Sequence, residues 1–348
     1  MTKSSNQEVR KIQFSGKSSF MLALPKKWVE EMGLHPGDQV VVSKQPDNSL
    51  MITTRGDDSH VIKNDAVIRV IQGESLSTLI RKIVSAYLLG YNLIQITTSS
   101  GTLTSTQKNG IKDLVRTRLV GAEVVADSSQ EITIQVLVSF FELSVENALR
   151  RMILISSSMH RDAMTALEKL DFDLAEGVIK TDDEVDRFNL YVVRQLKMAI
   201  QRDRVLQEIG LTSARDCLGY RLIVKSVERV ADHASKIAQE VMTIKSPLDA
   251  RLYSELKGLS DFSLKVFEES GIALFKRDYN IADQVVEKSK LLNELEKSFI
   301  ERLEKEGTKE ILHTIRPIIE GIRRTAELAS DIAEVVLNMT AQSVIITT

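Results

Sequence analysis

The pattern of apolar and polar positions changes twice along the 348-residue chain. Up to about residue 58, short apolar runs separated by turns predict four or five short strands, with one amphipathic helix after the second. From about 66 to 140, strand-like and helical runs alternate, which predicts a small α/β or α+β domain. From about 144 onward, apolar residues recur at helical spacing and predict bundles of long helices.

The N-terminal strands are too short and too few to enclose a core of their own. The helix between them places Trp28, Val29 and Met32 on one face. So small a set of strands buries too little surface for a stable monomer. We therefore expect this segment to form its core with a second copy, as a homodimer.

The middle segment has helix-capping residues and a hairpin but no catalytic cluster. Ser75 and Thr104 precede its two helical runs, where their hydroxyl groups can cap the helices. Strands are expected at 122–129 and 131–139 as a hairpin, and the single Gly73 after the first strand is no dinucleotide-binding fingerprint. A structural or ligand-sensing spacer is the favoured interpretation.

The helical part predicts two three-helix bundles in tandem, related by duplication. Residues 172–188 match 279–295 in their apolar positions, and 227–241 match 322–336. The second match is dense in alanine and serine, which let helix backbones approach closely. The expected helices cover 144–171, 173–206, 211–244, 249–278, 279–306 and 308–341.

The tripeptide Gly16-Lys17-Ser18 ends a phosphate-binding Walker A loop in many proteins. That loop needs a further glycine at position 11 and a helix directly after the serine. Position 11 is a lysine, and residues 20–25 predict a buried strand ending at a proline. We therefore do not expect a nucleotide-hydrolysing loop.

Composition indicates a globular, multidomain chain. Charged residues make up 27% and the formal net charge is -2, so any nucleic-acid surface must be local. The single Cys217 excludes a disulfide framework and a cysteine-cluster zinc site, and it fits a reducing compartment. The first residues lack the apolar core of an export signal, and no run approaches 18 uncharged apolar residues. We expect a cytoplasmic protein that does not span a membrane.

Two acidic pairs are the strongest candidate chemistry. Asp182 with Asp186, and Glu228 with Asp232, are each spaced so that both carboxylates lie on one helix face. Across a turn near 207–210 the two pairs are about equally distant, so the four carboxylates should lie at one height. Helical bundles assemble metal sites in this way, and oxygen donors suit magnesium, calcium, manganese or iron.

A plainer interpretation stays open for these residues. Acidic residues four apart are common on solvated helices and repel only weakly there. His233 could bias a site toward a transition metal, but a hydrogen-bonded helix residue is the more ordinary role. The corresponding residues of the second bundle, which cannot form the same ligand set, are Ser289, Asn293, Arg323 and Glu327.

Basic residues gather near the N-terminus, opposed there only by Glu8. A dimer would double their charge on one surface, where it could neutralise DNA phosphates. The alternative is that they are the solvating charges of a dimerisation module. The residues are Arg10, Lys11, Lys17, Lys26 and Lys27.

Two segments resemble known families. The string SGKSSFMLALPKKWVEEMGLHPGDQVVV is similar to the AbrB/SpoVT (MazE-like) swapped-hairpin domain. The helical part resembles the PhoU family of phosphate-uptake regulators through Asp182-Asp-Glu-Val-Asp186 and Glu228-Arg-Val-Ala-Asp232. The order AbrB-like, small α/β, PhoU-like resembles archaeal PhoU regulators.

The resemblance implies DNA binding by a dimer and metal- or phosphate-linked sensing. In the PhoU family the acidic motifs bind multinuclear iron or zinc clusters, and the protein acts on a phosphate transporter or a histidine kinase. The loss of the motif in the second repeat puts a second cluster in doubt. The implied cofactors are iron or zinc, with magnesium or manganese also compatible with the carboxylates.

The leading hypothesis is a non-enzymatic, DNA-binding transcriptional regulator linked to phosphate homeostasis. The alternative is an adaptor that regulates a phosphate transporter or kinase and uses its N-terminal domain only to dimerise. A di-metal enzyme is disfavoured because no Glu-x-x-His pair or nucleophile–base pair is found. The overall class is multidomain α+β, with expected domains at 1–58, 59–142, 143–246 and 247–348.

Overall fold

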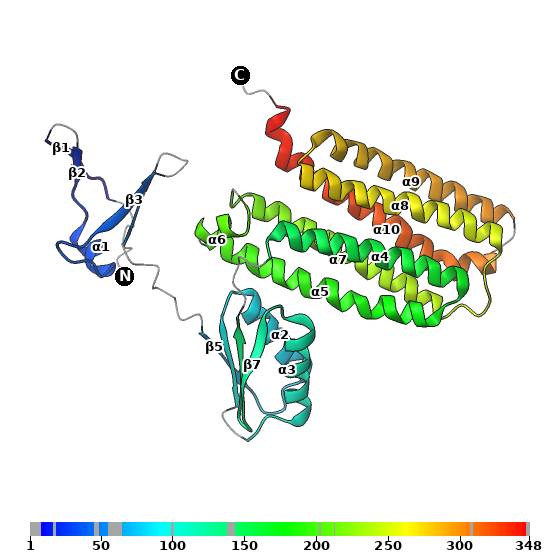
Figure 1. Cartoon of the computed structure of the whole chain (residues 1–348), viewed down its shortest axis with the longest axis horizontal. Coiled ribbons are helices and arrows are strands. Elements are labelled where there is room, and N and C mark those ends of the chain that lie inside the picture. Colours follow the sequence, from blue (N-terminus) through cyan, green and yellow to red (C-terminus); the bar gives the residue numbers. More distant parts are fainter. Residues whose placement is uncertain are drawn as a thin grey trace. The chain divides into compact units, whose positions relative to one another are not determined.

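The chain divides into two compact units, Met1–Lys63 and Asn64–Thr348, in the computed structural model (Figure 1). Lys17 lies outside the described residues. The residues that the structure describes are 8–16, 19–44, 49–54, 65–98, 101–137, 143–201, 203–211, 213–306 and 309–345.

The N-terminal unit consists of two separate hairpins and one short helix. Strand β1 (Ile12–Ser15) pairs antiparallel with β2 (Ser19–Leu22), and β3 (Val40–Lys44) pairs antiparallel with β4 (Leu50–Thr54). Helix α1 (Lys26–Glu31) lies between the hairpins in sequence. The order of strands and helix is the expected one.

Almost nothing in the N-terminal unit is buried by the unit itself. Pro25 is the only buried residue among those described there. Phe14 and Phe20 pack edge to face with centroids 5.3 Å apart, yet they remain 66% and 71% exposed. Since burial of apolar area is the main source of folding free energy, the described part of this unit contributes little stability by itself.

The second unit begins with a four-stranded sheet covered by two helices. Its strand order is β5-β6-β8-β7, in which β5 and β6 are parallel and the other pairs are antiparallel. Ser75 and Thr104 cap the two helices as predicted, and Thr104 forms a full capping box with Gln107. The elements are β5 (Asp65–Val70), α2 (Leu76–Leu88), β6 (Leu93–Thr98), α3 (Ser105–Arg118), β7 (Ala122–Asp127) and β8 (Glu131–Val136).

The rest of this unit is helical and confirms the predicted α+β class. Helices α4, α5 and α7 (green in Figure 1) pack on one another, as do α8, α9 and α10 (yellow to red). Contacts of α7 with α10 and of α4 with α8 join the two bundles. The helices are α4 (Val145–Lys169), α5 (Phe172–Gln201), α6 (Asp203–Glu208), α7 (Asp216–Val241), α8 (Ala250–Lys276), α9 (Tyr279–Lys305) and α10 (Lys309–Thr340), followed by a 3-10 turn (Ala341–Ser343).

The start of α7 differs from the expectation. A helix was expected from residue 211, whereas α7 begins at Asp216. Gly210 ends the preceding helix with a φ of +82°, which favours glycine and turns the chain. Apolar periodicity across residues 211–215 therefore predicted a helix where the chain makes a turn.

A single apolar core runs through both bundles because small residues let the helices come close. Ala234 of α7 and the corresponding Ala329 of α10 are fully buried. At Gly321, a β-carbon would lie 2.8 Å from the side chain of Ile237, so only glycine fits there without a shift. No helix in the described part of the chain is long and apolar enough to cross a membrane.

A buried arginine attaches the sheet domain to the first bundle. Arg194 of α5 is 4% exposed, and its guanidinium donates to the carbonyl oxygens of Tyr87 and Gly90, the latter at 3.2 Å. It also donates to Asn92 Oδ1 at 2.8 Å and lies 4.8 Å from the centroid of the Tyr87 ring. These acceptors close the C-terminal end of α2, where a cation is favoured. The sheet domain is therefore held to α5 by polar contacts as well as by apolar packing.

Candidate functional site

The four predicted carboxylates are near neighbours in the structure. Asp182 and Asp186 project from α5, and Glu228 and Asp232 from the adjacent α7. Burial, together with repulsion from Asp232, Asp186 and Glu228, raises the pKa of Asp182 to about 7. Because the two pairs are equally far from the interhelical turn, they lie close to each other on the neighbouring helices.

Two protein cations that the sequence analysis did not consider lie beside these carboxylates. Lys225 Nζ donates to Glu228 Oε1 at 2.5 Å and also contacts Oε2. Arg118 reaches from α3 of the sheet domain to Asp183, at 2.9 Å, and to Asp186, at 3.7 Å. The acidic cluster is therefore partly neutralised from within the protein.

The pKa values of Glu228 and Asp186 show how burial and these cations compete. Burial raises the pKa of Glu228, and the hydrogen bond from Lys225 opposes that shift. Burial likewise raises the pKa of Asp186, and the Arg118 guanidinium opposes it. The burial effect exceeds the cation effect at both residues, so the pKa of both carboxyls is raised despite the nearby cations.

The donor atoms of the cluster are of the type that a hard cation prefers, but the side chains are not arranged around a common point. Its donors are all carboxylate oxygens, and Asp182 Oδ1 is buried with no hydrogen-bond partner. However, among the described residues no group of three or more His, Cys, Asp and Glu side chains is placed to hold a metal ion. A bound cation therefore remains a prediction from the type of donor and from the orphaned oxygen.

His233 lies on a different side of α7 from the acidic cluster. Burial, together with the charges of Lys236, Arg229 and Arg324, lowers its pKa to about 4, so the ring is neutral at pH 7. Consecutive helical residues point about 100° apart, which is why a neighbour of Asp232 faces the second bundle. The suggestion that His233 biases the carboxylate site toward a transition metal has no support in this placement.

The two lysines predicted to contact DNA stand at the start of α1. Lys26 Nζ lies 3.6 Å from Glu30, and Lys27 Nζ lies 3.8 Å from Glu31. The lysine side chains are 89% and 70% exposed, so these pairs are weak and solvent-screened. Both ammonium groups are therefore accessible to an anionic partner.

The other predicted DNA contacts lie before the first strand or outside the described residues. Arg10 is paired with Glu8, and Lys11 is exposed with no ion pair shown in the described part of the chain. Lys17 cannot be placed because it lies outside that part. The structure therefore describes four of the five basic residues, two of them on α1.

A fully buried histidine between the bundles was not anticipated. His160 of α4 is 0% exposed, and its Nε2 lies 2.8 Å from the hydroxyl of Ser260 on α8. Its Nδ1 lies 3.4 Å from the hydroxyl of Thr325 on α10. Burial lowers its pKa to about 4. No local sequence pattern marks this residue, since its partners Ser260 and Thr325 are distant in sequence.

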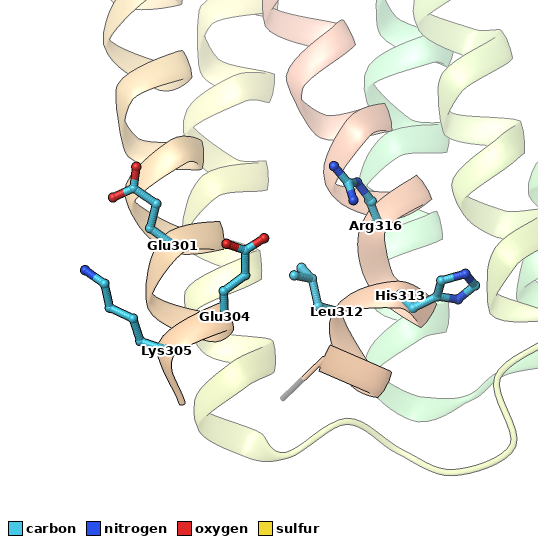
Figure 2. A pocket seen from close by; sticks show the side chains of 6 residues that line it. All are labelled: Glu301, Glu304, Lys305, Leu312, His313 and Arg316. Atoms are coloured by element: carbon cyan, nitrogen blue, oxygen red, sulfur yellow. The ribbon is translucent and has the colours of Figure 1, made fainter. Parts of the chain in front are cut away.

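A separate cleft of about 630 Å³ opens between the end of α9 and the start of α10. Figure 2 shows that its lining comes from the last turns of α9 and the first turns of α10. Both charge signs are present, and none of the predicted site residues contributes. The side chains are Glu301, Glu304, Lys305, Leu312, His313 and Arg316.

Two family models match this chain. Residues 13–59 match the model described as "Antidote-toxin recognition MazE, bacterial antitoxin". Residues 149–241 match the PhoU domain. Both resemblances expected from the sequence are therefore confirmed.

Relatives match the helical part of the chain. A phosphate-specific transport system accessory protein PhoU homolog of Aquifex aeolicus (strain VF5) is 28% identical over 133 residues, 38% of this chain and 58% of its own length. The Borreliella burgdorferi homolog of the same name is 27% identical over 139 residues, 38% of this chain and 61% of its own length. This chain thus spans about three fifths of the length of both relatives.

A solved structure supports the fold of the same region. The crystal structure of PhoU from Pseudomonas aeruginosa aligns with a TM-score of 0.50 at 21% identity. The alignment covers 57% of this chain and 96% of that one. The likeness supports a shared fold over the aligned part of this chain.

Proposed function

We propose that this chain is a non-enzymatic, DNA-binding transcriptional regulator that responds to phosphate or metal status. The observation that carries the proposal is the union in one chain of a MazE-like unit and a PhoU-like helical region. The named relatives are accessory proteins of phosphate transport. A link to phosphate uptake is therefore the broad role, and DNA binding is the means by which this chain would exert it.

The exposed apolar surface of the N-terminal unit supports dimerisation. Apolar residues of the β3–β4 hairpin are exposed, among them Val41 at 47%, Val42 at 57% and Leu50 at 66%. A second copy offers the same surface and so can complete the core by an isologous interface. Two copies of Lys26 and Lys27 would then be available to the phosphates of one duplex.

The acidic cluster is the proposed cation site. Asp182, Asp186, Glu228 and Asp232 would hold the ion, and iron, zinc, magnesium or manganese are the candidates. A bound cation supplies positive charge that offsets the mutual repulsion of these carboxylates. Support comes from the buried, unpartnered oxygen of Asp182 and from the raised pKa of Asp182.

DNA binding is tested by fluorescence anisotropy with random-sequence and promoter-derived duplexes over a salt series. The Lys26→Ala/Lys27→Ala variant should bind more weakly, with a shallower salt slope because fewer counterions are released. A matched control is Lys180→Ala/Lys297→Ala, which removes two exposed lysines with the same i,i+4 glutamate pairing from the helices. Wild type that binds no duplex at low salt would refute the proposal.

Metal content is tested by elemental analysis of protein purified without chelator. Wild type should carry one of the candidate metals, and Asp186→Ala/Asp232→Ala should lose it. Equal, negligible metal in both proteins would refute the cation site. The carboxylates would then be balanced only by Lys225 and Arg118.

An adaptor without DNA binding is the second candidate. It is favoured by the glutamates that face both lysines on α1, since they reduce the positive charge of that helix. In that case the dimer should form normally, and the protein should bind a phosphate transporter or kinase without binding any duplex.

A further inference from the structure

A cleft of about 310 Å³ lies where α7 of the first bundle meets α9 and α10 of the second. Its lining includes three uncharged polar side chains, Ser289, Asn293 and Ser330, and three cationic ones. The cations come from three different helices and are Arg229, Lys290 and Arg324.

This cleft is the second repeat's counterpart of the acidic cluster. The alignment of the repeats places Ser289 over Asp182 and Asn293 over Asp186, and both residues line the cleft. Two carboxylates of the first repeat are thus replaced by a hydroxyl and an amide. The amide is a hydrogen-bond donor, which a carboxylate is not.

Two of the cations are available for a ligand. Arg229 makes no hydrogen bond or ion pair that the structure shows within the described residues, and it is exposed. Lys290 pairs with Glu287 at 2.7 Å, but both side chains are 66% exposed, so this bridge is weak and easily exchanged. Arg324 is less free, because it lies 2.9 Å from Glu327.

The cleft also contains two carboxylates, Glu327 and Asp331. Glu327 is neutralised by Arg324 and by Arg323, which reaches it from the preceding turn. Asp331 interacts electrostatically with Arg229. Three cations against two carboxylates leave the lining with one net positive charge.

We infer that this cleft binds a small oxyanion, with inorganic phosphate as the fitting ligand. An arginine guanidinium can donate two parallel hydrogen bonds to phosphate oxygens, and a lysine and an amide add further donors. The volume is at the lower end of ligand pockets, which favours a small anion over a whole nucleotide. The inference deepens the proposed function, because it names a site for the phosphate to which the regulator would respond.

The test is isothermal titration calorimetry of the full chain with sodium phosphate at constant ionic strength. Wild type should bind, and Arg229→Gln should bind about tenfold more weakly or worse because a charged hydrogen-bond donor is lost. Asn293→Asp, which restores the first-repeat carboxylate, should also weaken binding. Arg221→Gln is the control, since Arg221 is exposed on the same helix and does not line the cleft.

Circular dichroism establishes that each variant is folded before the titration is interpreted. Absence of phosphate binding by wild type at millimolar concentrations would overturn the inference, and so would equal affinity of Arg229→Gln and wild type. Binding of ATP but not of free phosphate would also overturn it. Because no DNA is present, phosphate binding here can stand even if the protein binds no duplex, and the two proposals fail separately.

Discussion

The two halves of the helical region share their packing but differ in the charges they carry. Ala234 and Ala329 occupy matching, fully buried positions in α7 and α10. In contrast, the first repeat presents Asp182 and Asp186 where the second presents Ser289 and Asn293. Positions that set the distance between helix backbones tolerate little change. At a cleft, the charge of a side chain can change with little effect on the stability of the fold. A duplicated bundle can therefore carry two sites of opposite charge preference.

The two repeats of the helical region also differ in their contacts with the sheet domain. Helix α5 holds the sheet domain through Arg194 and through the Arg118 contacts to Asp183 and Asp186. In α9, the residue that corresponds to Arg194 is Glu301, which is exposed. The first repeat therefore joins its acidic cluster to a second domain, and the second repeat has no such connection at this position.

The largest expected effect comes from removing the buried arginine. Arg194→Ala leaves the acceptors on Tyr87, Gly90 and Asn92 without their donor, so the free energy of unfolding should fall by about 3 kcal/mol. Glu301→Ala in the second repeat should change it by less than about 0.5 kcal/mol. Urea denaturation followed by circular dichroism measures both. Similar losses in the two variants would contradict the asymmetry of the repeats.

The next effect concerns pH and the histidine between the halves. The pKa of His160 is about 4 when folded and near 6.5 when unfolded, so the unfolded chain binds more protons between these values. Its contribution to stability is complete above pH 6.5 and is lost as the pH falls toward 4. Asp182, whose folded pKa is raised, acts in the opposite direction as the pH rises from about 4 to 7.

His160→Gln should therefore reduce the gain in unfolding free energy between pH 4 and 6.5, whatever its effect at a single pH. Denaturation curves at several pH values measure this slope. The control is His313→Gln, because His313 is exposed on α10. An unchanged slope in His160→Gln would show that the buried ring does not govern it.

A smaller effect is expected at the acidic cluster itself. At pH 8 with a chelator present, Asp182→Asn should raise the free energy of unfolding by roughly 1 kcal/mol, because a half-buried charge with an unpartnered oxygen is removed. Asp283→Asn on α9 removes an exposed carboxylate and should be close to neutral. With a binding metal added, the sign for Asp182→Asn should reverse. A loss of stability without metal would show that the cluster is already balanced.

The smallest effect is expected for Arg118→Gln. Its contacts to Asp183 and Asp186 are partly exposed, so the loss should stay below about 1 kcal/mol and shrink with added salt. Thermal melting at low and high ionic strength measures it. A salt-independent loss as large as that of Arg194→Ala would mean that Arg118 acts by packing.

Much of the fold could be predicted because its helices are long and strongly periodic. The caps at Ser75 and Thr104 were recognisable since capping depends on local residue type. The start of α7 was missed because residues 211–215 continue the apolar spacing, so the turn was expected to end at Gly210, whereas α7 begins at Asp216.

The acidic cluster was only half predictable. Helical spacing and the position of the turn sufficed to bring together the two carboxylate pairs. Lys225 had a local signal, its place three residues before Glu228. Arg118 had none, since it belongs to another domain and reaches Asp183 only in the folded chain. His160 and Arg194 were missed for the same reason, because their partners are distant in sequence.

Among the described residues of the N-terminal unit Pro25 alone is buried, and this has a consequence for mass action. A fold completed by a second copy has a midpoint of unfolding that depends on protein concentration, and each tenfold dilution lowers its stability by about 1.4 kcal/mol. The bundles, which enclose their own core, have no such dependence. If the N-terminal unit dimerises as proposed, dilution would melt this unit and leave the bundles intact, and the concentration of the chain would set how much of the unit is folded.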